Sequence, residues 1–532
     1  MGWVYIAGGV TLFFLIAWRL DSRGSTTHGS ARWLTIWEAY RKGLLTRGAL
    51  IVGTWLGRLP VYANTPHAIT FGWTGSGKGT SAILPNLLSY SQLFVNDPGG
   101  ENTAVAIGAW RDRGYEVFVI NPFGMFREAP WSLPTHSFNP LSILAAESQT
   151  FSADAMLIAE MLVTRTGSEQ NSSLYFKDAA QSALRAMIMH IVTTEPAERR
   201  HLGTLYSYVN SDAAGWEALV KSMQANPVCD GMVAAEANTL ERREAQASEE
   251  FSAVLSTAQQ DLNWLADPLV RAHMARSDVD LDTLKGNKPG QTGGIISVVL
   301  PLEYSESCSA ITRLTLGCAI WAMQRGKLAK RPALFVIDEA AALGKISRFP
   351  RWLSTLRKYR VALWPIFQNV GQVQALYGRG WQTFIANCGL KQFLGVGDIE
   401  TAEYVEKLLG NATITTRSQS SQGGISTSEA RRPLLTAEEI MRLGASEQIV
   451  LIGALKPLLI TKTPFWEQSA VKGRALPNPY HAGTPRPSLR AAGADLQQTV
   501  MLILLWALAP HPAAVLLYLL GLALWLGPLM GG

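Results

Sequence analysis

The sequence predicts an α/β protein with a mainly parallel sheet, and three observations support this class. Short apolar strands bounded by turn residues alternate with helical segments. A long stretch with helical spacing interrupts the alternation, and two long uncharged runs lie near the ends of the chain. Because 48% of the 532 residues are apolar and only 17% are charged, part of the chain is expected to lie in lipid.

The N-terminal uncharged run is WVYIAGGVTLFFLIAW, residues 3–18, and Arg19, Arg23 and Arg32 follow it. It is slightly shorter than the roughly 20 residues that span a bilayer. A cleaved signal peptide is the alternative, but no basic region precedes the run and no small-x-small site ends it. The positive-inside rule therefore favours an uncleaved anchor over residues 1–22, with the following residues in the cytoplasm.

The C-terminal hydrophobic region covers residues 499–532. Pro510 and Pro512 divide it into a first arm that is too short to cross alone and a second arm, 513–530, that just reaches. The sequence leaves open a single membrane-spanning helix and a tight hairpin, with a buried core helix as a third interpretation. Residues 471–498 are rich in Pro, Ala and Arg and predict a flexible linker.

The strand pattern occurs in two blocks that flank the helical stretch. Because the two halves of a sheet need each other to bury their faces, we expect one nucleotide-binding domain made of residues 23–150 and 291–470. Residues 151–290 are expected to form an inserted all-α domain. A Ser/Gly-rich segment, 416–432, is expected to be a solvated linker. The predicted strands are 67–72, 92–100, 115–124, 293–303, 333–344, 362–369, 390–398 and 448–454.

A phosphate-binding loop is predicted in the stretch FGWTGSGKGT, which follows the first strand and opens a helix. In such a loop successive backbone N–H groups surround the β-phosphate, and the lysine bridges the β- and γ-phosphates. The residues expected to bind the nucleotide are Gly72, Thr74, Gly75, Ser76, Gly77, Lys78, Gly79 and Thr80.

The loop departs from the usual pattern at Gly79, where a serine or threonine normally provides a hydroxyl ligand for Mg²⁺. Thr80 follows immediately, and we expect its hydroxyl to reach the metal directly or through a water. We therefore expect the loop to work, and Gly79→Ser to be tolerated.

An acid pair stands at the end of the apolar strand in ALFVIDEA, where Asp338 and Glu339 follow Ile337. A nucleotide-hydrolysing site needs one carboxylate for Mg²⁺ and one for the attacking water, and ligands bind at the carboxyl ends of strands in open α/β sheets. Gln368 ends the strand in LWPIFQN. Its amide could sense the γ-phosphate or orient water, or it could simply be a turn residue.

Taken in order, these and other motifs resemble the TraG/TraD-type type IV coupling proteins, the membrane ATPases of conjugative DNA transfer and type IV secretion. The resemblance covers most of residues 28–467. Its pieces are HGSARW (28–33), GWTGSGKGTSAILPNLL (72–88), DPGGEN (97–102), FNPL (138–141), VIDEAAALGKI (336–346), PIFQNVGQVQALYG (365–378) and RRPLLTAEEIMRLGASEQIVLI (431–452).

The resemblance implies a RecA-like P-loop NTPase with an inserted all-α domain, assembled as a homo-hexamer at the inner membrane with its ATPase domain in the cytoplasm. It implies ATP and Mg²⁺ as cofactors, and single-stranded DNA with relaxase proteins and type IV secretion channel components as partners. It assigns phosphate binding to Lys78, magnesium coordination to Asp338, catalysis as a base to Glu339 and γ-phosphate sensing to Gln368.

Such rings usually receive an arginine finger from the neighbouring subunit. Arg357 and Arg360 are the candidates, although either could be an ordinary surface arginine. The chain departs from the family at Gly99, where the acidic turn commonly has lysine, and in showing one N-terminal hydrophobic helix where two are usual.

Composition leaves the cargo open. The net charge of +6 is weak evidence for nucleic acid, because cytoplasmic parts of membrane proteins are basic for reasons of topology. A coupling ATPase for protein effectors and a non-catalytic membrane scaffold are the alternatives, and the acid pair argues against the scaffold. The four cysteines show no C-x-x-C spacing, which predicts buried reduced thiols and argues against structural zinc.

Overall fold

The computed structural model describes residues 26–46, 50–419 and 425–481. Both predicted membrane regions, 1–22 and 499–532, and most of the predicted linker lie outside these residues. Within the described ranges, no helix combines the length and the apolar character needed to cross a bilayer.

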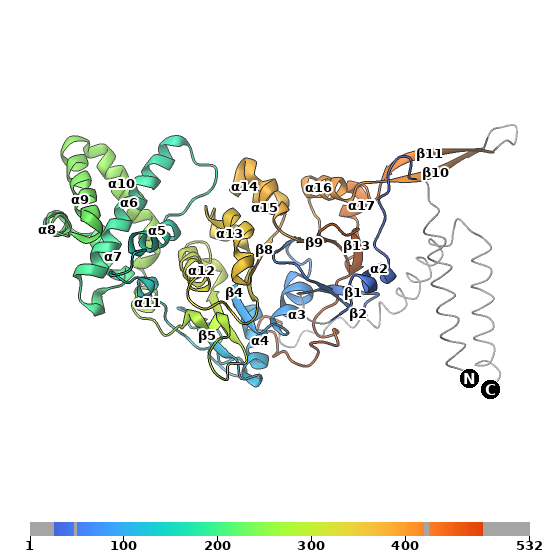
Figure 1. The fold of residues 1–532 in the computed structure, drawn as a ribbon, viewed down its shortest axis with the longest axis horizontal. Coiled ribbons are helices and arrows are strands. Elements are labelled where there is room, and N and C mark those ends of the chain that lie inside the picture. The colour runs from blue at the N-terminus through green and yellow to red at the C-terminus, as the bar shows by residue number, and fades with distance from the viewer. Residues whose placement is uncertain (1–25, 47–49, 420–424, 482–532) are drawn as a thin grey trace. The chain divides into compact units, whose positions relative to one another are not determined.

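Most strands of the described part of the chain belong to one large sheet (Figure 1). Its 11 strands run in the order β2-β1-β13-β12-β9-β3-β8-β7-β4-β6-β5. From β9 to β5 all neighbours are parallel, whereas β12, β13, β1 and β2 extend the other edge in antiparallel pairs. The strands are β1 Leu50–Trp55, β2 Leu59–Ala63, β3 Ala68–Gly72, β4 Gln92–Pro98, β5 Glu116–Ile120, β6 Gly294–Leu300, β7 Ala333–Ile337, β8 Val361–Phe367, β9 Leu390–Gly395, β12 Glu447–Ile452 and β13 Leu458–Thr461.

Every predicted strand is present, and the mixed α/β class with a largely parallel sheet is confirmed. The sequence did not reveal β1, β2 and β13. They belong to the antiparallel edge, where the signal is weak because β2 contains Pro60 and begins with exposed residues.

Helices cover both faces of the sheet, which is why its strands are continuous apolar runs. In β7 the side chains of Phe335 and Ile337 enter one buried cluster, and those of Leu334 and Val336 enter the other. The helices that accompany the sheet are α2 Ile36–Arg41, α3 Leu84–Leu87, α4 Glu101–Asp112, α12 Ser309–Met323, α13 Phe349–Thr355, α14 Val370–Tyr377, α15 Trp381–Ala386, α16 Ile399–Leu409 and α17 Ala437–Met441.

The stretch with helical spacing is indeed helical between β5 and β6, and within the described residues it contains no strand. Four of its helices, α6, α8, α9 and α10, lie together in Figure 1. The helices are α5 Phe151–Leu162, α6 Asn171–Thr194, α7 Leu202–Val209, α8 Ala213–Gln224, α9 Val228–Gln246, α10 Ser248–Leu262 and α11 Pro268–His273. Three cysteines are buried as expected, and Cys229 in α9 is partly exposed.

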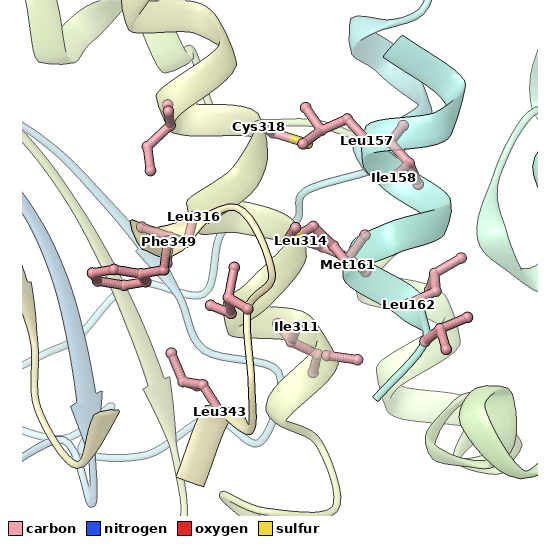
Figure 2. Packing of buried hydrophobic residues seen from close by; sticks show 14 of the residues in the cluster. Leu157, Ile158, Met161, Leu162, Ile311, Leu314, Leu316, Cys318, Leu343 and Phe349 are labelled. Atoms are coloured by element: carbon pink, nitrogen blue, oxygen red, sulfur yellow. The ribbon is translucent and has the colours of Figure 1, made fainter. Parts of the chain in front are cut away.

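The helical insertion is joined to the sheet by the packing of α5 on α12. Figure 2 shows Leu157 and Met161 of α5 facing Cys318 and Leu314 of α12. The helices approach closely at Gly317, where a Cβ atom would lie 2.9 Å from Met161 Cγ. The contact is therefore part of the main hydrophobic core.

A buried arginine adds polar links to this joint. Arg313 of α12 is only 3% exposed, and burial lowers its pKa to about 10. Its guanidinium donates to the backbone oxygens of Met161 (2.9 Å), Leu162 (3.3 Å) and Leu343 (3.1 Å). It also donates to Thr164 Oγ1 (2.8 Å) and to Ser309 Oγ (3.0 Å). These acceptors tie together the end of α5, the start of α12 and the loop that follows β7.

Parts of two segments that the sequence predicts to be linkers have defined structure: one contains a pair of strands, and the other is hydrogen-bonded to α4. Two strands, β10 Asn411–Gln419 and β11 Ile425–Pro433, form an antiparallel pair, so the expected linker is wrong for these residues. Threonines favour strands even when both faces are exposed, and Thr416 Oγ1 lies 2.7 Å from Ser428 Oγ across the pair. In the predicted linker after residue 470, the N–H of Leu476 donates to the carbonyl of Val105 in α4 (2.9 Å).

We predict that Arg313→Met lowers the free energy of unfolding by about 2–4 kcal/mol, because buried carbonyl groups lose their donor while the methionine still fills space. Urea unfolding of the full chain in detergent, followed by tryptophan fluorescence, measures the midpoint. Arg442→Met, which breaks an exposed ion pair with Glu438, is the control and should leave the midpoint nearly unchanged. Equal midpoints for the two variants would contradict the role of Arg313.

Candidate nucleotide-binding site

The parallel strands bring the predicted site residues to one edge of the sheet. The neighbours β3, β8, β7 and β4 all point the same way, so their carboxyl ends lie side by side. The residues at or just beyond these ends are Gly72 as the last residue of β3, Gln368 after β8, Asp338 after β7 and Asp97 in β4.

The predicted phosphate-binding loop connects β3 to a π-helical turn, Lys78–Ile83. Gly75 and Gly77 have φ angles of 87° and 88°, a left-handed conformation that glycine adopts readily. Thr74 at the tip is exposed, whereas Ser76 is buried and its hydroxyl has no hydrogen-bond partner. The loop is thus built for a close approach of its backbone to a ligand.

Residues that follow β13 donate hydrogen bonds to backbone oxygens of the loop and of the π-helical turn after it. Lys462 Nζ donates to the carbonyl oxygens of Ser76 (3.2 Å) and Leu394 (2.5 Å), and burial lowers the pKa of Lys462. The N–H of Phe465 donates to the carbonyl oxygen of Thr80 (2.9 Å). Sequence reasoning missed both residues, because they follow a strand that it also missed.

Among the three predicted catalytic side chains, that of Glu339 contacts both of the others. Lys78 Nζ lies 3.1 Å from Glu339 Oε1, and Gln368 Nε2 donates to Glu339 Oε2 at 3.3 Å. Adjacent residues of a strand face opposite ways, but β7 ends at Ile337, and Glu339 takes a left-handed conformation with φ 48°. Both acids can therefore face the loop.

A second acid that the sequence did not single out, Asp97, lies beside Asp338. Burial raises the pKa of Asp97 to about 6, although it accepts the N–H of Thr103 at 2.6 Å. Burial, with the charges of Glu339 and Asp97, raises the pKa of Asp338 to about 7, against the opposing effect of Lys78. Asp97 lies near the carboxyl end of the largely apolar strand β4, and an acid in that position is a signal that could have identified it.

Asn102, in the first turn of α4, connects the two acids. Its Nδ2 donates to Asp97 Oδ1 at 3.1 Å and approaches Asp338 Oδ2 at 3.5 Å. The predicted metal ligand Thr80 has its hydroxyl 3.5 Å from the carbonyl oxygen of Gly77. In the described ranges no three His, Cys, Asp or Glu side chains gather closely enough to hold a metal alone. Mg²⁺ in phosphate sites is commonly held by the phosphates with one or two protein oxygens.

Comparison with known sequences decides the family. A sequence model of the family described as type IV secretory system conjugative DNA transfer matches residues 31–485. The chain belongs to this family. The match agrees with the order of motifs from the loop to the acid pair and beyond.

Individual relatives in this family are distant but aligned over most of the chain. Protein VirD4 of Rhizobium rhizogenes is 26% identical over 480 residues, which cover 85% of this chain and 68% of the relative. Conjugal transfer protein TraG of Agrobacterium fabrum is 25% identical over 502 residues, which cover 85% of this chain and 72% of the relative. Both therefore share the region that contains the sheet and its site.

Solved structures support the fold. The conjugative coupling protein TrwB lacking 70 N-terminal residues, in its unbound form, matches with a TM-score of 0.60 at 17% identity, covering 83% of this chain and 96% of that chain. TrwB in complex with ADP and Mg²⁺ matches with a TM-score of 0.58 at 18% identity, covering 81% of this chain and 93% of that chain. The protein described here therefore has the same fold as TrwB.

The two candidate arginines lie at the opposite edge of the sheet, next to the start of β8. Arg360 Nη1 donates to the carbonyl oxygens of Ala329 (2.9 Å) and Lys330 (2.7 Å), so it is engaged within its own chain. Arg357 is exposed. Both arginines therefore lie at the opposite ends of the strands from the loop and the acid pair.

We predict that Asp338→Asn raises the free energy of unfolding of the nucleotide-free, metal-free protein at pH 8 by about 1–3 kcal/mol. The pKa of Asp338 is raised by folding, so the unfolded chain releases this proton at lower pH than the folded chain. The wild-type protein therefore loses stability as pH rises from about 4 to 7, and the asparagine variant is spared this loss.

Urea midpoints in EDTA at pH 5 and pH 8 measure the effect, which should be smaller at pH 5. Asp112→Asn, at the exposed end of α4, is the matched control. A stabilisation by Asp338→Asn that does not grow with pH would contradict the prediction.

Proposed function

We propose that this chain is a membrane-anchored coupling ATPase that recruits a DNA–relaxase substrate and moves it into a type IV secretion channel. One observation supports it above others: Glu339 is held between Lys78 and Gln368 at the carboxyl ends of adjacent parallel strands, beside the glycine-rich loop. The relative TraG is a conjugal transfer protein, and TrwB forms a complex with ADP and Mg²⁺. The proposed inner-membrane anchors are residues 1–22 and 499–532.

Each residue has a role in ATP hydrolysis that follows from its contacts. Backbone N–H groups of the loop bind the phosphates, and Lys78 leaves Glu339 to pair with them. Glu339 then accepts a proton from the attacking water, and Gln368, already hydrogen-bonded to Glu339, orients that water. A scaffold without turnover would not need this arrangement.

The residues present fit Mg²⁺. Asp97 and Asp338 concentrate negative charge beside the loop, and the buried amide oxygen of Asn102 has no donor. Asp338 would hold the ion through water, with Thr80 as the second predicted ligand. The ion would neutralise charge on the transferring phosphoryl group.

Activity is proposed to require a homo-hexamer in which an arginine reaches the neighbouring site. Arg357 is the better candidate, because the Arg360 guanidinium already caps two backbone carbonyls of its own subunit. In such an arrangement hydrolysis depends on contacts between subunits, and these contacts change as nucleotide turns over.

The full chain in detergent or nanodiscs should hydrolyse ATP faster when single-stranded DNA is added. Lys78→Ala should abolish nucleotide binding and hydrolysis, and Glu339→Gln should bind ATP while hydrolysing it roughly 10²–10⁴-fold more slowly. Lys407→Ala and Glu438→Gln, on exposed helical surfaces, are matched controls that should retain activity.

The outcomes separate the alternatives. Robust hydrolysis without any response to DNA would favour a coupling ATPase for protein effectors. Nucleotide binding without hydrolysis in the wild-type chain would favour the scaffold.

Mixing two inactive variants tests the arginine. Lys78→Ala subunits still present Arg357, and Arg357→Ala subunits still present an intact loop, so mixed hexamers should regain roughly a quarter of wild-type hydrolysis if subunits assemble at random. Arg360→Ala mixed with Lys78→Ala is the comparison. Recovery with Arg360→Ala but not with Arg357→Ala would reverse the assignment.

A further inference from the structure

The position after the loop lysine has no side chain, and a polar atom from another segment borders the space that a side chain would enter. A Cβ atom added to Gly79 would lie 3.4 Å from Oδ1 of Asn102, and that oxygen is its nearest neighbour. Asn102 belongs to α4, so a different segment of the chain places a polar oxygen where the usual serine or threonine would extend.

The orientation of the Asn102 amide is fixed by the two acids. Carboxylate oxygens accept hydrogen bonds, so the Nδ2 group must face Asp97 and Asp338, at 3.1 Å and 3.5 Å. Oδ1 therefore points away from them and toward Gly79.

This oxygen is both buried and without a donor. Asn102 is only 5% exposed, and its Oδ1 has no hydrogen-bond partner within the described part of the protein. A buried acceptor without a partner is unusual in a folded protein and indicates a missing ion or water. Amide oxygens are suitable ligands for Mg²⁺, and carboxylates lie next to this one.

We propose that Asn102 Oδ1 binds the nucleotide-associated Mg²⁺, directly or through one water, in place of the hydroxyl that Gly79 lacks. Asp338 acts on the same ion. This assignment rests on the proposed function, since it needs a nucleotide with its metal in the loop. In this assignment Gly79 has no side chain to offer the ion, and Asn102 provides the oxygen ligand instead.

A purely structural role for Asn102 is the competing explanation, because its Nδ2 also holds the two acids together. The two roles differ in what can rescue them. A hydroxyl on residue 79 can replace a metal ligand, but it cannot replace the amide donor between Asp97 and Asp338. Serine is also sterically possible at position 79, where the only close neighbour of an added Cβ is the Asn102 oxygen itself.

The test measures magnesium coupling, defined as the affinity for a fluorescent ADP analogue in Mg²⁺ divided by that in EDTA, with the full chain in nanodiscs. Asn102→Ala should reduce this ratio about tenfold while leaving the affinity in EDTA within about twofold. Asn102→Ala combined with Gly79→Ser should restore most of the ratio. Gly79→Ser alone should keep it, and Asn210→Ala, an exposed asparagine of the helical insertion, is the matched control.

Mn²⁺ binding to the ADP-loaded protein, followed by the loss of the free-ion EPR signal, gives a second readout that is independent of hydrolysis. Mn²⁺ affinity should fall in Asn102→Ala and recover in the double variant. Unchanged coupling in Asn102→Ala, an equal loss of affinity in EDTA and in Mg²⁺, or no recovery in the double variant would each overturn the assignment. A wild-type chain that binds no nucleotide would instead overturn the proposed function, and this assignment with it.

Discussion

The parallel pairing of β3, β8, β7 and β4 is the constraint on which the rest of the site depends. Residues far apart in the sequence become neighbours because each follows one of these strands at the same edge. Lys78 and Glu339 meet for this reason, although 261 positions separate them. The helical insertion does not disturb the pairing, because it leaves the sheet after β5 and returns to it before β6.

Negative charge is concentrated at this edge, and the protein accommodates it at a cost to stability. Asp97 and Asp338 both hold their protons more tightly than exposed aspartates, because burial disfavours the charged form. Lys78 offsets only part of this charge, and in the proposed mechanism it turns from Glu339 to the phosphates when nucleotide binds. The site is therefore arranged for a cation to enter together with the nucleotide.

Local patterns were enough to predict the strands of the parallel core, the loop and the acid pair, because each is a short run with its own signature. Gln368 was predicted only as one of two interpretations, and its contact with Glu339 needed the order of the strands. Asn102 and Lys462 could not be assigned from the sequence, because their importance depends on which distant groups they contact. The strand pair β10–β11 was missed because both of its faces are polar, so no alternation of apolar residues marks it.

The hydrogen bonds of Arg313 restrict how far the segment after Glu339 can move relative to the helical insertion. The carbonyl of Leu343 that it holds lies in the short segment leading away from Glu339, and three of its other acceptors lie at the end of α5 and just beyond it. Arg313 is itself buried, and apolar side chains of α5 and α12 pack together in the same joint (Figure 2). The segment behind the acid pair therefore cannot shift without drawing the insertion along or breaking hydrogen bonds of this buried side chain. Arg313 thus couples the segment that follows Glu339 to the helical insertion.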